Sequence, residues 1–75
     1  MAEIKFQIIK NLKVLSKNEK NGWTKEINLI SWNDAEPKFD IRSWDPEHHK
    51  MGRGVTLSKE ELQELLSIDP MEFEE

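Results

Sequence analysis

The chain has 75 residues, which is enough for one small domain whose hydrophobic core would be marginal on its own. It contains no cysteine, which excludes a disulfide framework and a thiolate zinc site, and its apolar runs are too short to span a membrane. Because the core is marginal and no disulfide or zinc stabilises it, we expect the chain to self-associate. The first residues lack the basic and apolar regions of a signal peptide, so we expect a soluble, cytoplasmic protein.

The net charge of −4 is unevenly distributed along the chain. Residues 1–57 carry ten Lys and Arg against eight Asp and Glu, whereas residues 58–75 carry one Lys against seven acids. The body of the domain is therefore mildly basic, and the acidity lies in the last quarter. The net charge does not argue against a polyanionic partner for the body.

The first predicted strand begins near the N-terminus, where Ile4, Phe6 and Ile8 alternate with polar residues. A period of two is typical of a strand with one covered face. The apolar pattern continues to Leu15, with a bulge or bend expected near Asn11.

Three further strands are separated by turn signals. Asn21-Gly22 predicts a tight turn, because both residues tolerate positive φ. The loop at residues 33–37 ends in a proline, and Asp45-Pro46 breaks the next strand. The predicted strands are Trp23–Trp32, Lys38–Trp44 and Arg53–Leu57.

A helix is predicted to begin at Ser58. Ser58 and Glu61 fit a capping box, and Asp69-Pro70 ends the helix. The apolar residues Leu62, Leu65 and Leu66 form a narrow stripe at helical spacing. The order predicts an α+β domain at residues 1–68, a meander of four antiparallel strands with one C-terminal helix covering a sheet face, followed by a frayed acidic tail at 69–75.

Parity assigns side chains to the two faces of the sheet. The odd positions of the second and third strands are apolar and are expected to form the core beneath the helix: Ile27, Leu29, Phe39 and Ile41. The even positions form the face expected to be solvated, yet they carry two tryptophans and two cations: Trp32, Trp44, Lys38 and Arg42.

Indoles beside cations suit single-stranded nucleic acid, because unpaired bases stack on aromatic rings and phosphates need positive charge. A core or dimer-interface role is the alternative for each tryptophan. Trp23 falls on the core parity, just after the turn, and remains open between the two roles. Lys25 shares that parity, but its long side chain can reach round the sheet edge.

The loop after the third strand adds two more cations, Lys50 and Arg53, near the end of the Trp44 strand. His48 and His49 do not predict a metal site, because adjacent histidines in extended chain point apart and no third ligand accompanies them. The sequence contains neither a phosphate-binding glycine loop nor a nucleophile elbow. We therefore expect no catalytic residues, no metal and no cofactor.

The stretch KFDIRSWDPEHHKMGRGVTLS, residues 38–58, resembles the transcriptional coactivator family called positive cofactor four, and most closely its short bacterial YdbC-like branch. The matching elements are Asp40-Ile41-Arg42, the aromatic Trp44, Asp45-Pro46-Glu47, and Gly52-Arg53-Gly54 leading into the helix start. Gly22-Trp23-Thr24-Lys25-Glu26 and Ser31-Trp32-Asn33 also resemble the bacterial branch.

The resemblance implies a strongly curved four-stranded antiparallel sheet followed by one helix, assembled as a homodimer whose concave surfaces bind single-stranded DNA with little sequence preference. Carried over by position, base stacking falls on Trp32 and Trp44. Phosphate contacts fall on the cations Lys38, Arg42, Arg53, Lys25 and Lys50. The chain departs from the family in two ways. The helix is short and runs into an acidic tail, which bears on the family's helix-mediated contacts. The regulatory region of eukaryotic members is absent, so coactivator activity is not carried over.

The sequence therefore predicts a non-catalytic homodimer that binds single-stranded DNA, with RNA as a second possible ligand. The competing hypothesis is a protein-interaction module, because Trp and Arg are also enriched at protein interfaces and the acidic tail suits a basic partner.

Overall fold

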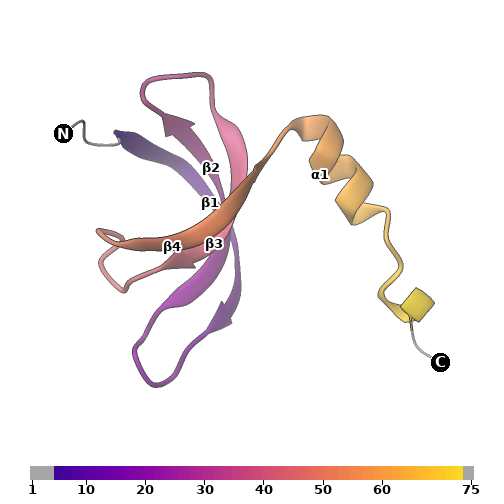
Figure 1. The fold of residues 1–75 in the computed structure, drawn as a ribbon, viewed down its shortest axis with the longest axis horizontal. Coiled ribbons are helices and arrows are strands. Elements are labelled where there is room, and N and C mark those ends of the chain that lie inside the picture. The colour runs from indigo at the N-terminus through magenta and orange to yellow at the C-terminus, as the bar shows by residue number, and fades with distance from the viewer. Residues whose placement is uncertain (1–4, 74–75) are drawn as a thin grey trace.

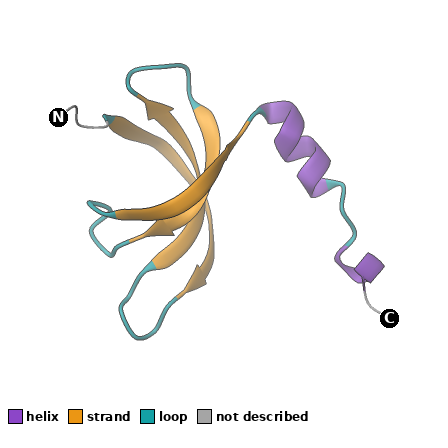
Figure 2. Ribbon diagram, in the orientation of Figure 1, coloured by secondary structure: helices purple, strands orange, loops and turns teal. Residues whose placement is uncertain are grey.

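The computed structural model describes residues 5–73; Ile4 of the predicted first strand and the last residues of the acidic tail lie outside the described residues. Four strands form one antiparallel sheet in the order β1-β2-β3-β4, and a single α-helix follows (Figures 1 and 2). This confirms the predicted α+β class. The elements are β1 (Phe6–Lys17), β2 (Thr24–Trp32), β3 (Lys38–Trp44), β4 (Met51–Leu57), α1 (Lys59–Leu66) and the short 3-10 helix η1 (Pro70–Phe73).

Local sequence signals account for two of the element boundaries. Ser58 caps α1: its hydroxyl accepts a hydrogen bond from the Glu61 N–H at 3.1 Å, and the Glu61 carboxylate accepts one from the Ser58 N–H at 2.8 Å. Between β1 and β2, Gly22 adopts a φ of 78°, a conformation that glycine reaches without steric cost. The predicted capping box is confirmed, and the chain turns where Asn21-Gly22 predicted a turn, although only Gly22 of the two has a positive φ.

The long strand β1 is bulged at regular intervals. Its pairing with β2 shifts register three times, between Ile8 and Lys10, Asn11 and Lys13, and Val14 and Ser16. Each shift leaves one β1 residue without a cross-strand partner: Ile9, Leu12 and Leu15. Because each bulge bends its strand and increases the twist, repeated bulges let β1 follow a strongly curved path.

The sheet curls so far that opposite corners meet. Phe6 pairs with Trp32 at one end of β2, and Trp44 pairs with Thr24 at the other end. These two ends would be about 26 Å apart in a flat strand. Nevertheless, the Phe6 and Trp44 ring centroids lie 5.2 Å apart. The face that carries both rings is therefore the inside of the curl, and Figure 1 shows the ends of the sheet bending toward the same side.

The predicted assignment of core and solvent faces is wrong. The buried side chains of β2 and β3 are at even positions: Glu26, Asn28, Ile30, Asp40 and Trp44. The odd positions expected in the core, Ile27, Leu29, Phe39 and Ile41, are partly exposed. Curling covers the concave face from within the sheet itself, so its polar residues are buried even though their pattern resembles a solvated face.

The expected packing of the helix over the sheet is also wrong. Helix α1 leaves the end of β4 and projects away from the sheet, near only β3 and β4 (Figure 1). None of its residues is buried; Leu65 is 44% exposed and Leu66 is 74% exposed. The apolar stripe predicted for the helix exists, but within a single chain the sheet leaves most of it uncovered.

Candidate nucleic-acid interface

An open groove on the concave face brings together residues from three strands. It encloses about 340 Å³ and is lined by Trp32, Asn33, Arg42, Met51 and Thr56. At its centre the Arg42 guanidinium carbon lies 4.8 Å from the centroid of the half-buried Trp32 ring. This separation is that of a cation–π contact. The curl makes the contact possible, because Arg42 pairs with Glu26, far along β2 from Trp32.

Arg42 is fixed by bonds to its neighbours. Its Nε donates to Asp40 Oδ1 at 2.6 Å and its Nη2 donates to Asp40 Oδ2 at 2.8 Å, which makes a two-pronged ion pair within one strand. Its Nη1 lies 3.4 Å from the Gly52 carbonyl oxygen and 3.3 Å from the Met51 sulfur. Asp40 is fully buried, so the pair supplies the charge that a buried carboxylate requires.

Trp44 is not exposed, which contradicts its predicted place on a solvated face. Its exposure is 0%, and it is the largest fully buried side chain in the described chain. Phe6 packs against one part of the ring, and His48 stacks on it with centroids 5.6 Å apart and planes inclined by 22°. An unpaired base cannot reach the ring in this arrangement. Trp44 is a core residue.

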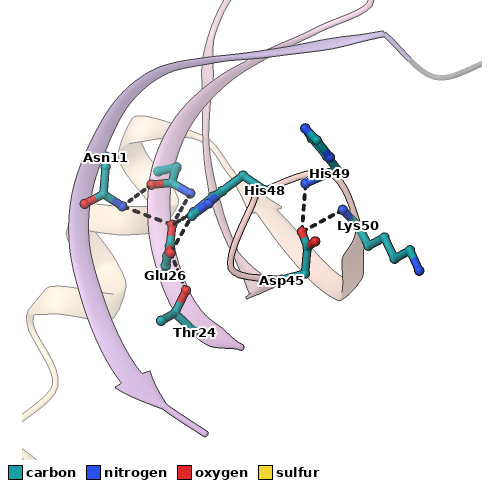
Figure 3. A network of polar contacts seen from close by, with 8 residues as sticks. Asn11, Thr24, Glu26, Asp45, His48, His49 and Lys50 are labelled. Atoms are coloured by element: carbon teal, nitrogen blue, oxygen red, sulfur yellow. Dashed lines mark hydrogen bonds and ion pairs between the residues drawn. The ribbon is translucent and has the colours of Figure 1, made fainter. Parts of the chain in front are cut away.

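A polar network beside Trp44 fastens the β3–β4 loop to the inside of the curl (Figure 3). His48 Nε2 donates to the Glu26 carboxylate at 2.9 Å. The same carboxylate accepts bonds from the Asn11 and Asn28 side-chain amides, each at 3.1 Å, and from the Thr24 hydroxyl. Asn11 also donates to the Asn28 side-chain oxygen at 2.6 Å. Three segments of the chain, β1, β2 and the β3–β4 loop, are thus tied together by one buried carboxylate.

The pKa of Glu26 reflects two opposing influences. Burial alone would raise it, because a low dielectric disfavours the carboxylate. Hydrogen bonds from Thr24, Asn28 and His48, together with the charge of His48, outweigh burial, and the pKa of Glu26 lies below its ordinary value of 4.5. The ionised form of Glu26 is therefore the form that the network stabilises.

The β3–β4 loop is also ordered at its base by Asp45. The Asp45 carboxylate accepts the backbone N–H groups of His49 and Lys50 at 2.7 and 2.8 Å (Figure 3). The Lys50 N–H bond is the main reason that the pKa of Asp45 is lowered, with the His49 N–H contributing further. His48 adopts a φ of 59° within this turn. The loop presents the Lys50 side chain away from Asp45 (Figure 3).

The other residues predicted to bind nucleic acid are mostly at the surface. Lys38, Lys50 and Arg53 are exposed, at the start of β3, in the β3–β4 loop and in β4. Lys25 is exposed but adjoins the buried Glu26 with opposite parity, so it stands on the outer face. Trp23 is half-buried just before β2. Of the predicted site residues, the structure thus brings Trp32 and Arg42 together in the groove. The others are not among the residues that line it: Trp23, Lys25, Lys38, Trp44, Lys50 and Arg53.

Several residues of this face were not predicted from the sequence to belong to the site. Phe6, Asp40 and Thr56 contribute to the concave face, through the ring contacts with Trp32 and Trp44 and through the Arg42 ion pair, which Thr56 joins by a 3.3 Å bond to Asp40. The spacing Asp40-x-Arg42 was a usable signal, because residues two apart on a strand share a face. No sequence signal marks the approach of Phe6 to Trp44.

Neither a metal centre nor a membrane span occurs in the part of the chain that the structure describes. Residues 5–73 contain no group of three or more His, Cys, Asp or Glu side chains arranged to hold a metal ion. No helix in that range is both long and apolar enough to cross a membrane.

Comparison with known proteins places this geometry in a family. Residues 19–68, which are more than half of the chain, match the model of the transcriptional coactivator p15 (PC4) family. The chain belongs to the PC4 family. A protein from Treponema pallidum, described as uncharacterized, is 41% identical over 71 residues, covering 87% of this chain and 82% of that protein. PC4 domains are DNA-binding and non-enzymatic, and the resemblance read from residues 38–58 is confirmed.

Proposed function

We propose that this PC4-family chain binds single-stranded DNA with little sequence preference, without catalysis, as a homodimer. The observation that carries the proposal is the half-buried Trp32 ring beside Arg42 at 4.8 Å, bordering an open groove. A partly exposed indole in a groove offers a surface on which an unpaired base can stack. Duplex DNA hides the faces of its bases, so such a groove favours unpaired strands.

Phosphate contacts in this proposal fall on the exposed cations Lys38, Lys50 and Arg53. Each neutralised phosphate releases counterions, so the logarithm of the association constant should fall with the logarithm of salt concentration by about 0.7 per contact. Lys25 stands on the outer face and is expected to contribute least. Replacing any one of these three exposed cations with glutamine should make the salt slope shallower by about 0.7.

The central test is Trp32→Ala. The change removes the stacking surface, and we expect the affinity for a 20-nucleotide oligo-dT to fall by roughly 5- to 150-fold, which corresponds to about 1–3 kcal/mol. Fluorescence anisotropy of labelled oligo-dT, titrated at fixed salt, measures the loss. Trp32→Phe keeps a ring and should retain most of the affinity, while circular dichroism checks that both variants fold.

The same titration separates the competing functions. Wild-type binding to oligo-dT with little binding to a duplex supports the proposal, and a parallel titration with oligo-U measures how far RNA competes. Unchanged oligo-dT affinity in a folded Trp32→Ala variant would refute the stacking role. If the wild-type protein binds none of the oligonucleotides, the nucleic-acid proposal fails and the protein-interaction hypothesis takes its place.

The homodimer in this proposal is supported by the uncovered helix. Leu65, Leu66 and Ile68 are all exposed, and so is Met71 further along. Such a row is unusual on the surface of a small monomer, because water contact with apolar side chains costs about 25 cal/mol per Å². Pairing two copies through their helices would cover this row.

We expect Leu66→Glu to weaken the dimer by at least about tenfold, because each dimer would lose two buried leucines and gain two charges. Sedimentation equilibrium at several protein concentrations measures the change. Gln63→Glu adds the same charge at an exposed polar position of the same helix and should leave the dimer unchanged. A Leu66→Glu variant that associates like the wild type would remove α1 from the interface.

A further inference from the structure

The ion pair between Asp40 and Arg42 constrains what Arg42 can do. Asp40 is fully buried and its carboxylate is held by Arg42 and by the Thr56 hydroxyl at 3.3 Å. Moving the guanidinium away would leave a buried carboxylate without a countercharge, which is strongly unfavourable. Arg42 is therefore held in place and largely neutralised before any ligand arrives.

The remaining contacts of Arg42 also indicate that its guanidinium is not free to bind a phosphate. Three of its nitrogens already have acceptors: Nε and Nη2 bond to Asp40, and Nη1 lies 3.4 Å from the Gly52 carbonyl oxygen. Its side chain is only 15% exposed. A phosphate that approached Arg42 would meet a largely buried, internally bonded group next to a carboxylate. Such a group attracts a phosphate far less than a free surface cation does.

Arg42 can instead contribute the flat surface of its guanidinium to base stacking. The guanidinium is flat and delocalised, lies over the Trp32 ring and lines the groove with it. Nucleobases stack on guanidinium planes as they do on aromatic rings. Because the guanidinium lies over the indole, the two planes form a stack, and an unpaired base would extend that stack.

Gly54 keeps this surface in place by lacking a side chain. It pairs with Arg42 across β3 and β4, and a Cβ added there would overlap Arg42 Cβ and the Ile41 carbonyl oxygen and lie 2.9 Å from Arg42 Nε. A side chain at this position would displace the guanidinium from its position over Trp32. Gly54 and Asp40 therefore confine Arg42 from two sides, one by shape and one by charge.

We infer that Arg42 is part of the base-stacking platform and not a phosphate contact, and that Asp40 and Gly54 are positioning residues that hold its guanidinium over Trp32. The ligand of this platform is one unpaired nucleobase, seated in the groove lined by Trp32, Arg42, Met51 and Thr56. The inference rests on the proposed binding of single-stranded DNA and assigns Arg42 a different role there from the phosphate contact expected from the sequence.

Two conservative substitutions give opposite results for the two roles. Arg42→Lys keeps the charge and removes the plane: a platform role predicts a loss of roughly 5- to 30-fold in oligo-dT affinity at an unchanged salt slope. A phosphate role predicts near wild-type affinity. Asp40→Asn releases the guanidinium: a platform role predicts weaker binding, whereas a phosphate role predicts tighter binding and a steeper salt slope, because a neutralising carboxylate is gone.

The experiment titrates each variant with 20-nucleotide oligo-dT and with an abasic strand of equal length, at four salt concentrations. The loss of affinity caused by Arg42→Lys should be seen with oligo-dT and should nearly vanish with the abasic strand. Misfolding would instead weaken binding to both strands. Lys38→Gln is the matched control. It should lose the same affinity for both strands, and its salt slope should be shallower by about 0.7. Circular dichroism checks the folding of Asp40→Asn, and the Arg42→Lys result decides the matter if that variant does not fold.

The outcomes distinguish the inference from the proposed function. If the wild-type chain binds no single strand, the proposed function fails and the platform falls with it. If the wild type binds but Arg42→Lys matches its affinity, or Asp40→Asn binds more tightly, the proposed function stands and the platform role is refuted.

Discussion

Trp44→Ala is expected to lower the free energy of unfolding by about 3–5 kcal/mol, the range typical of deleting a buried aromatic side chain. Trp44 is 0% exposed and lies between Phe6 and His48, so its removal would open a cavity where the corners of the curled sheet meet. A domain of this length has a total stability of about 4–11 kcal/mol. The substitution should therefore leave the fold marginal or lost.

Urea denaturation followed by circular dichroism, at one fixed protein concentration, measures this effect. The melting temperature should fall by more than about 12 °C. Trp32→Ala is the matched control: the same truncation at a half-buried ring should cost less stability while costing DNA affinity. A Trp44→Ala variant with wild-type stability but weakened DNA binding would restore the exposed, stacking role that the sequence suggested.

The contrast between Trp32 and Trp44 shows which features of the structure a local sequence pattern can predict and which it cannot. Turn residues, the Ser58 cap and the break at Asp45-Pro46 are local signals, and they located the elements well: β3 has the predicted bounds, and β2 begins one residue later than expected. The strand order followed because short connections between antiparallel strands leave a meander as the simplest path.

The face assignment failed for a reason that lies outside any one strand. A period-two pattern reports which side chains share a face, and it grouped Trp32, Arg42 and Trp44 on the even parity. It does not report which face the sheet will curl around. That choice depends on bulges at Ile9, Leu12 and Leu15 and on contacts between residues far apart in the chain.

Buried polar residues made the error hard to avoid. Glu26, Asn28 and Asp40 lie inside the curl, and hydropathy alone assigns such residues to water. Each is retained in the interior by partners from other segments, such as Asn11 and His48 for Glu26. A satisfied polar core of this kind is visible only once those partners are known.

Glu26 gives the second large effect, and it depends on pH. Its pKa in the folded chain lies below the ordinary value of 4.5, because hydrogen bonds to the carboxylate outweigh the effect of burial. A group with a lowered pKa contributes stability above its unfolded pKa and loses that contribution as pH falls through the folded pKa. We therefore expect wild-type stability to be flat from pH 7 to about pH 5 and to decline in more acid solution.

Glu26→Gln tests the assignment, because it keeps the shape of the side chain and removes its charge. At pH 7 we expect a loss of about 2–3 kcal/mol, since glutamine offers one oxygen where Asn11, Thr24 and His48 all require an acceptor. Urea titrations between pH 7 and pH 3 should show this difference shrinking below about pH 4.5, as the wild-type carboxylate becomes protonated as well.

Glu19→Gln provides the control, because Glu19 is an exposed acid in the β1–β2 turn whose loss should change stability little at any pH. A His48→Gln variant, combined with Glu26→Gln in a double-mutant cycle, isolates the contribution of the loop. Coupling between the two positions at pH 7 that vanishes in acid would place the Glu26–His48 bond at the centre of the network. A constant difference between wild type and Glu26→Gln across the whole pH range would instead show that the charge of Glu26 is irrelevant, and that the loss comes from hydrogen bonds that the protonated acid makes and glutamine does not.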